Sequence, residues 1–113
     1  MKKNGLHIDE YGTKCWYKNG LAHREDGPAV IDRDGTQYWY KDGSLHREDG
    51  PAVIRPSGYM AWYRHNRWHR DDGPARVWPD GITPQWYKHG SPYIPSSHEI
   101  MTWKMNEKER TTY

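Results

Sequence analysis

The chain is built from an internal repeat. Four Trp-Tyr pairs mark its units, and they begin at Trp16, Trp39, Trp62 and Trp86. The first two units, WYKNGLAHREDGPAVIDRDGTQY and WYKDGSLHREDGPAVIRPSGYMA, are identical at 14 of 23 positions. Residues 7–12 match the end of a preceding unit. The third unit differs from the first two more than these differ from each other, and the fourth loses the pattern after Tyr93. A period of this size predicts a stacked, quasi-linear array in which each unit contacts its neighbours.

Two kinds of turn divide each unit into hairpins. Asn19-Gly20 and Asp42-Gly43 are typical of two-residue hairpin turns, in which both residues take positive φ. The pairs at 65–66 and 89–90 occupy the same slot. Segments 32–35, 55–58 and 78–81 each end in Gly, which predicts a type I turn followed by a bulge. The chain is therefore expected to be all-β, an antiparallel meander of hairpin repeats of about 23 residues.

These turns also fix a register. A three-residue loop at 33–35 places Val30 opposite Tyr38 and Ile31 opposite Gln37, and a two-residue loop at 42–43 places Tyr40 opposite Leu45. Alternation then gives one face that barely varies between units and is the expected core; in one unit it carries Ala29, Ile31, Trp39 and His46. The other face varies and is expected to be half exposed; it carries Val30, Tyr38, Tyr40 and Leu45.

The C-terminal segment has a different pattern. Ser96 and Glu99 have the spacing of a capping box, and Ile100, Trp103 and Met105 recur at helical intervals together with Met101. We expect one helix over residues 97–109 that closes the open end of the sheet. The predicted organisation is a β-repeat domain at 1–95 and a capping helix with its tail at 96–113.

Composition limits the classes of function. Lys and Arg number 17 and Asp and Glu 15, and a net charge of +2 does not favour bulk nucleic-acid or membrane binding. Leu, Ile and Val are few, so 7 Trp and 9 Tyr must supply the core. No apolar run approaches the ~18 residues of a membrane span, and no apolar segment follows the basic N-terminus as in a signal peptide. A single cysteine, Cys15, fits a reducing cytoplasm.

The recurring block His-Arg-x-Asp-Gly-Pro-Ala is interpreted as scaffold, because a catalytic site is rarely needed three times in one small domain. Its His and Asp side chains can satisfy backbone amides at the turns. The residues assigned to the scaffold are Trp16, Trp39, Trp62, Trp86, His23, His46, His69, Asp26, Asp49 and Asp72. The histidines show no metal-ligand spacing, no nucleophile stands out beside a base, and the glycines form no phosphate loop. The sequence therefore predicts a non-enzymatic protein without metal or cofactor.

Positions that differ between units are free to carry function. The third unit deviates most, and its candidate binding residues are Tyr63, Arg64, His65, Arg67, Trp68, Arg76 and Trp78. In the predicted register Tyr63, Trp68, Arg76 and Trp78 share the variable face. Arg and Trp are frequent hot-spot residues, and they also suit anionic ligands with stacking bases. The alternative is a solvated strand on which each arginine rests on its own aromatic neighbours.

The repeats WYKNGLAHREDG and WYKDGSLHREDG resemble MORN-type repeats, in particular the variants of the YwqK antitoxin-like family and those of bacteriophage and large-virus proteins. The resemblance covers residues 6–93 and implies a protein-interaction scaffold with no catalytic residues. The resemblance suggests a phage-type inhibitor that acts in the host cytosol on a bacterial or host protein complex, such as a defence system. The same resemblance is also compatible with an antitoxin role. Two alternatives remain. One is a homo-oligomer that sequesters a small anionic, nucleotide-like signal, and the other is single-stranded nucleic-acid binding.

Overall fold

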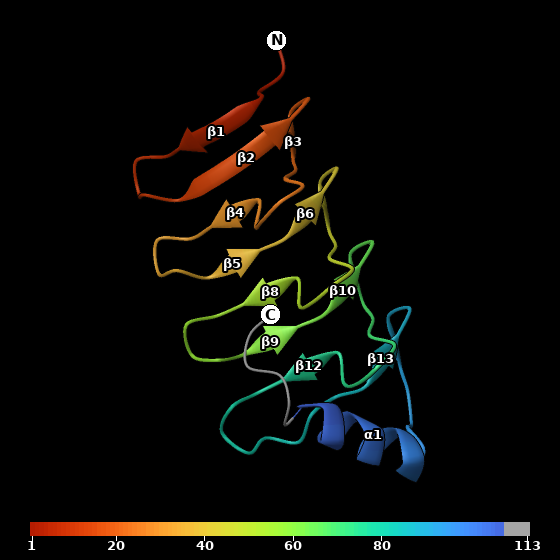
Figure 1. The fold of residues 1–113 in the computed structure, drawn as a ribbon. Helices are drawn as coiled ribbons and strands as arrows, with labels where there is room; N and C mark the ends of the chain where they lie inside the picture. The colour runs from red at the N-terminus through yellow and green to blue at the C-terminus, as the bar shows by residue number, and fades with distance from the viewer. Residues whose placement is uncertain (108–113) are drawn as a thin grey trace.

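The computed structural model describes residues 1–107 and shows an elongated ladder of short antiparallel strands with one helix at its C-terminal end (Figure 1). Its principal extents are 52 × 25 × 21 Å. The main sheet contains β1 (Gly5–Ile8), β2 (Lys14–Lys18), β3 (Leu21–Ala22), β4 (Val30–Ile31), β5 (Gln37–Tyr38), β8 (Val53–Ile54), β9 (Met60–Ala61) and β12 (Arg76–Val77). Its strand order is β1-β2-β4-β5-β8-β9-β12, with β3 paired to β2, so neighbours in sequence are mostly neighbours in space.

Small hairpins form a second column beside this sheet (Figure 1). They pair β6 (Tyr40–Lys41) with β7 (Ser44–Leu45), β10 (Tyr63–Arg64) with β11 (Arg67–Trp68), and β13 (Tyr87–Lys88) with β14 (Ser91–Pro92). Successive hairpins are linked by backbone hydrogen bonds, among them Gly43 N–H to the Ala22 carbonyl and Gly90 N–H to the Trp68 carbonyl, both at 2.9 Å. The ladder is therefore held together along both of its long sides.

The turn chemistry expected from the sequence is confirmed. Both residues of the Asn19-Gly20 turn have positive φ, at 51° and 82°, and the His65-Asn66 turn achieves 50° and 67° without glycine. At the opposite edge Gly58 has φ 98° and donates its N–H to the Arg55 carbonyl at 2.9 Å. Glycine is required at 58 for a second reason, since a Cβ there would lie 3.1 Å from the Pro79 ring.

The predicted register is also confirmed. Val30 pairs with Tyr38, Ile31 pairs with Gln37, and Tyr40 pairs with Leu45. The same alternation continues between units, where Tyr38 pairs with Val53. One face of the ladder therefore collects the residues that vary between units.

The distribution of the core differs from the expectation. The predicted core face is confirmed in part: it buries Ala29, Ala52 and Ala75 completely, and His46 and Trp62 are also buried. Trp39 and Ile31 on the same face are only half-buried. The hydrophobic cluster lies on the face expected to be half exposed, where Val53, Tyr59 and Ala61 are buried; it is completed by Tyr38, Leu45, Tyr63, Trp68 and Trp78. The physical reason is that a single-layer sheet has no opposing layer, so large rings on both faces cover their small neighbours laterally.

Helix α1 (Ser97–Glu107) begins at the predicted capping box. Ser96 Oγ accepts the Glu99 N–H at 3.1 Å, and the Glu99 carboxylate accepts the Ser96 N–H at 3.0 Å. The half-buried face carries Glu99, Ile100, Trp103 and Glu107, whereas Met101 and Met105 of the predicted apolar stripe are exposed. The expected end at 109 lies outside the described residues. Within residues 1–107, the helix is too short and too polar to cross a membrane.

Candidate functional site

Each of the first three units stacks an arginine on its leading tryptophan. The guanidinium carbons of Arg24, Arg47 and Arg70 lie 3.9, 4.0 and 3.9 Å from the ring centroids of Trp16, Trp39 and Trp62. Each arginine also donates from Nε to the aspartate two residues later (Asp26, Asp49 or Asp72) and from Nη1 to the carbonyl of Pro28, Pro51 or Pro74. These contacts lie within the unit, and they are consistent with the scaffold role expected of the tryptophans and aspartates.

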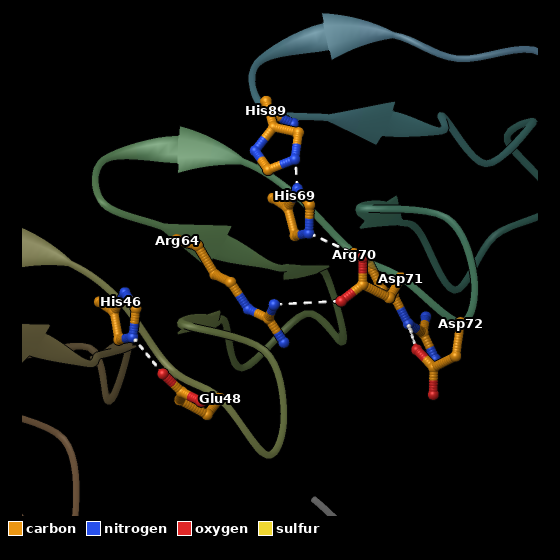
Figure 2. A network of polar contacts seen from close by, with 8 residues as sticks. All are labelled: His46, Glu48, Arg64, His69, Arg70, Asp71, Asp72 and His89. Atoms are coloured by element: carbon orange, nitrogen blue, oxygen red, sulfur yellow. Dashed lines mark hydrogen bonds and ion pairs between the residues drawn. The ribbon is translucent and has the colours of Figure 1, made fainter.

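Three histidines, His23, His46 and His69, link one unit to the next. Figure 2 shows one of these links, between His69 and His89. His23, His46 and His69 are buried, and Nε2 of each faces a carboxylate, that of Glu25, Glu48 or Asp71, at 2.7, 3.1 and 2.9 Å. Nδ1 of each accepts a backbone N–H from the following hairpin, that of Asp42, His65 or His89, at 2.9, 3.2 and 3.0 Å. The hydrogen bonds from histidine hold the pKa of the Glu25 and Glu48 carboxyls below their ordinary value.

At both ends of the described ladder, other residues take over these contacts. Asn4 Oδ1 accepts the Asn19 N–H at 2.9 Å, as a histidine Nδ1 does for the later hairpins. At the other end Tyr93 stands seven residues after Trp86, where the earlier units have histidine, and its N–H bonds the Trp86 carbonyl at 2.9 Å. The Tyr93 hydroxyl donates to the Glu99 carboxylate, and Trp103 packs edge-on against Trp86 at 6.0 Å.

Four of the predicted binding residues come together on the variable face: Tyr63, Trp68, Arg76 and Trp78. The Arg76 guanidinium lies 4.5 Å from the Trp68 ring and 4.8 Å from the Trp78 ring. Tyr63 and Trp68 pair across their hairpin with ring centroids 6.0 Å apart. All four side chains are half-buried.

Sequence reasoning missed Tyr59, which completes this group. The Tyr59 hydroxyl accepts Arg76 Nε at 3.0 Å, and its ring lies 5.3 Å from that of Trp78. The signal was present, because the equivalent position three residues before the next tryptophan is Thr36 in the preceding unit. We call Tyr59, Tyr63, Trp68, Arg76 and Trp78 the aromatic–arginine patch.

The other three predicted binding residues do not join the patch. Arg64 bonds Asp71 at 3.1 Å on the face that carries the histidines (Figure 2). The His65 ring lies 4.5 Å from that of His46. The Arg67 stem lies against Gly90 of the next hairpin. The seven predicted binding residues therefore do not form one site: four lie in the patch, and Arg64, His65 and Arg67 make their contacts elsewhere.

Within the patch, Arg76 does rest on its own aromatic neighbours, as the alternative interpretation expects. Its Nη1 also donates to Gln85 Oε1 at 3.1 Å. The Trp68 indole N–H is buried and has no hydrogen-bond partner among the described residues. The arrangement is thus a group of aromatic rings packed around one arginine, in which Tyr59 is buried and the other side chains are half-buried.

On the histidine side, two shallow grooves of about 570 and 590 Å³ lie between successive units. Arg47, Glu48 and Asp49 line both of them. The charges of opposite sign in these grooves largely pair with each other, as in the contacts of Arg47 with Asp49 and of Arg64 with Asp71. Within residues 1–107, no group of three His, Cys or carboxylate side chains could hold a metal ion.

Comparison with known proteins finds no significant match to a family model, to a curated protein or to a solved structure.

Proposed function

We propose that the protein is a non-enzymatic interaction module that binds a protein partner through the aromatic–arginine patch. The observation that carries the proposal is that Arg76 is fixed among Tyr59, Trp68 and Trp78 while the Trp68 and Trp78 rings remain partly accessible on one face. Trp, Tyr and Arg are the residues most enriched at interface hot spots. Because the contacts within the patch already hold these side chains, binding costs little conformational entropy.

The rest of the ladder acts as the support for this patch. In this proposal the units are MORN-type hairpin repeats, and α1 is the cap that ends them. The support for the cap is that Tyr93, Glu99 and Trp103 supply the contacts that histidine, carboxylate and arginine make in the earlier units. The likeness of WYKDGSLHREDG to repeats of phage proteins adds the partner class, a bacterial protein or complex that the module inhibits in the cytosol.

Replacing Trp78 tests the proposal. Trp78→Ala is expected to weaken capture of the partner about 30-fold or more, as removal of a hot-spot residue of at least ~2 kcal/mol does. Affinity for the partner recovered with the wild type is measured by titration, and thermal unfolding by circular dichroism verifies the fold of each variant. Trp78 lies against Tyr59 at the margin of the hydrophobic cluster, so the ladder is expected to remain folded.

Tyr11→Ala is the matched control, because Tyr11 is an exposed aromatic residue in the β1–β2 turn, far from the patch. It should bind as the wild type does. Equal affinities of a folded Trp78→Ala variant and the wild type would rule out the patch as the binding site.

A further inference from the structure

The third unit places an arginine where the first two units place a valine. Val30, Val53 and Arg76 each follow the leading tryptophan of their unit by 14 residues. In the sheet, Ala61 pairs with Val53 on one side and with Arg76 on the other, so these side chains lie in one row on the variable face. Val53 is buried and Arg76 is half-buried. A position that is apolar in the earlier units therefore carries a positive charge here.

The chain does not neutralise this charge with a carboxylate. Four other arginines pair with a carboxylate at 2.9 to 3.2 Å: Arg24, Arg47, Arg64 and Arg70. Among residues 1–107, Arg76 forms no such ion pair. Its Nε and Nη1 donate instead to the Tyr59 hydroxyl and to the Gln85 side-chain carbonyl, both of which are uncharged. These acceptors orient the guanidinium but leave its charge uncompensated.

A second arginine at the patch, Arg55, is in a different situation. Its guanidinium lies 4.9 Å from the Tyr59 ring, and the residue is exposed to solvent. Hydrogen bonds from Thr36 and, to a smaller extent, the charge of Arg55 hold the pKa of the Asp34 carboxyl below its ordinary value. Arg55 therefore has both water and a carboxylate of this chain to compensate its charge, which leaves Arg76 as the uncompensated cation of the patch.

A partner that covers the patch must remove Arg76 from water. The guanidinium lies 4.5 Å from the Trp68 ring and 4.8 Å from the Trp78 ring, so a surface that packs on these rings also covers the arginine. Burying a charge without a counter-charge is costly, and this cost would offset the gain from covering the rings. The counter-charge has to come from the partner, because the chain supplies none at this place.

We propose that the partner binds through an acidic segment, in which one Asp or Glu carboxylate pairs with Arg76 and a neighbouring apolar side chain covers the Trp68 and Trp78 rings. This inference rests on the proposed function, since it specifies the chemistry of the segment that docks on the same patch. The bonds to Tyr59 and Gln85 use Nε and Nη1 of Arg76 and leave Nη2 to donate to the carboxylate. A carboxylate matches the single charge of Arg76, whereas a phosphate group carries about two negative charges.

Selection from a displayed library of random, unphosphorylated peptides tests the inference, with the full chain as bait. The wild type is expected to enrich peptides that carry Asp or Glu beside an aromatic or aliphatic residue. The most enriched peptide is then synthesised, and its affinity for each variant is measured by titration. Loss of binding by a folded Trp78→Ala variant shows that the peptide occupies the patch.

Arg76→Val is expected to weaken binding of this peptide about 30-fold or more, the range for removing one partner of a buried charge pair. The substitution restores the residue of the two earlier units, so the variant is expected to fold with no loss of thermal stability. A purely structural role of Arg76 would instead lower the stability and leave the affinity unchanged. Arg55→Ala is the matched control, since an exposed arginine at the margin should change the affinity less than about threefold.

Replacing the acidic residue of the peptide by its amide gives a second, independent measurement that does not depend on how a variant of the protein folds. The amide peptide should bind the wild type about 30-fold more weakly, and it should bind Arg76→Val no more weakly than the acidic peptide does. Patch-bound peptides without a carboxylate, or an amide peptide that binds the wild type as tightly as the acidic one, would overturn the inference and leave the patch as a binding site. If no enriched peptide depended on Trp78, the proposed function itself would be contradicted.

Discussion

Arg70→Ala is expected to lower the free energy of unfolding by about 3 kcal/mol, the range for losing a buried charged group together with its packing. The Arg70 side chain is only 1% exposed, stacks on Trp62 at 3.9 Å and donates to the Pro74 carbonyl at 3.1 Å. It also lies 3.6 Å from Glu107 of α1, so its loss removes a contact between the third unit and the helix. Urea denaturation monitored by tryptophan fluorescence measures the effect.

Arg24→Ala is the matched control within the same chain. Arg24 makes the same stacking contact with Trp16 at 3.9 Å and the same pair with Asp26 at 3.2 Å, but its side chain is 28% exposed. Because water competes for these contacts, Arg24→Ala is expected to lower the free energy of unfolding by only about 1 kcal/mol. Equal losses for the two variants would show that burial does not set the strength of the arginine–tryptophan contact.

Trp103→Ala is expected to lower the free energy of unfolding by about 2 to 3 kcal/mol and to detach α1 from the ladder. The indole packs edge-on against Trp86 and approaches Gly73 so closely that a Cβ there would lie 2.8 Å from its ring. Its N–H donates to Glu107 at 3.1 Å. The measurement is equilibrium unfolding together with hydrogen exchange in β13 and β14, which should lose protection first.

Met101→Ala serves as the control for the helix. Met101 is exposed, so its removal should change stability by no more than about 0.5 kcal/mol. If Trp103→Ala were equally neutral, the helix would not be a cap, and its role would have to be sought elsewhere.

The local elements of this fold could be predicted from the sequence because each is determined by residues close together in the chain. Asn19-Gly20 readily takes positive φ at both residues, as this hairpin turn requires, and alternation between two fixed turns leaves one register for Val30 and Tyr38. The capping box of Ser96 and Glu99 is similarly local.

Contacts between units could not be predicted in this way. The bond from the Asp42 amide to His23 Nδ1 spans 19 residues, and it depends on how one hairpin column stacks beside a separate sheet. The stacking of Arg24 on Trp16 lies within one unit, but it also depends on tertiary structure, namely on how the chain bends after His23.

Only part of the candidate site could be predicted, because membership of the patch depends on which face of the strand each side chain occupies. The alternation placed Tyr63, Trp68, Arg76 and Trp78 on one face, and these four do come together. Arg64, His65 and Arg67 were added to the candidate set from the composition of the third unit alone, and Arg64 bonds Asp71 outside the patch. Comparing equivalent positions between units, as for Thr36 and Tyr59, would have completed the patch.

Native mass spectrometry of the tagged protein recovered from bacterial lysate tests whether the patch binds a protein partner. A second polypeptide at fixed stoichiometry is expected, present with the wild type and with Tyr11→Ala but lost with a folded Trp78→Ala variant. An oligomer carrying a few hundred additional daltons per site, or bound single-stranded nucleic acid whose retention falls steeply with salt, would contradict it. The first of these results would indicate a ligand trap, and the second a nucleic-acid-binding protein.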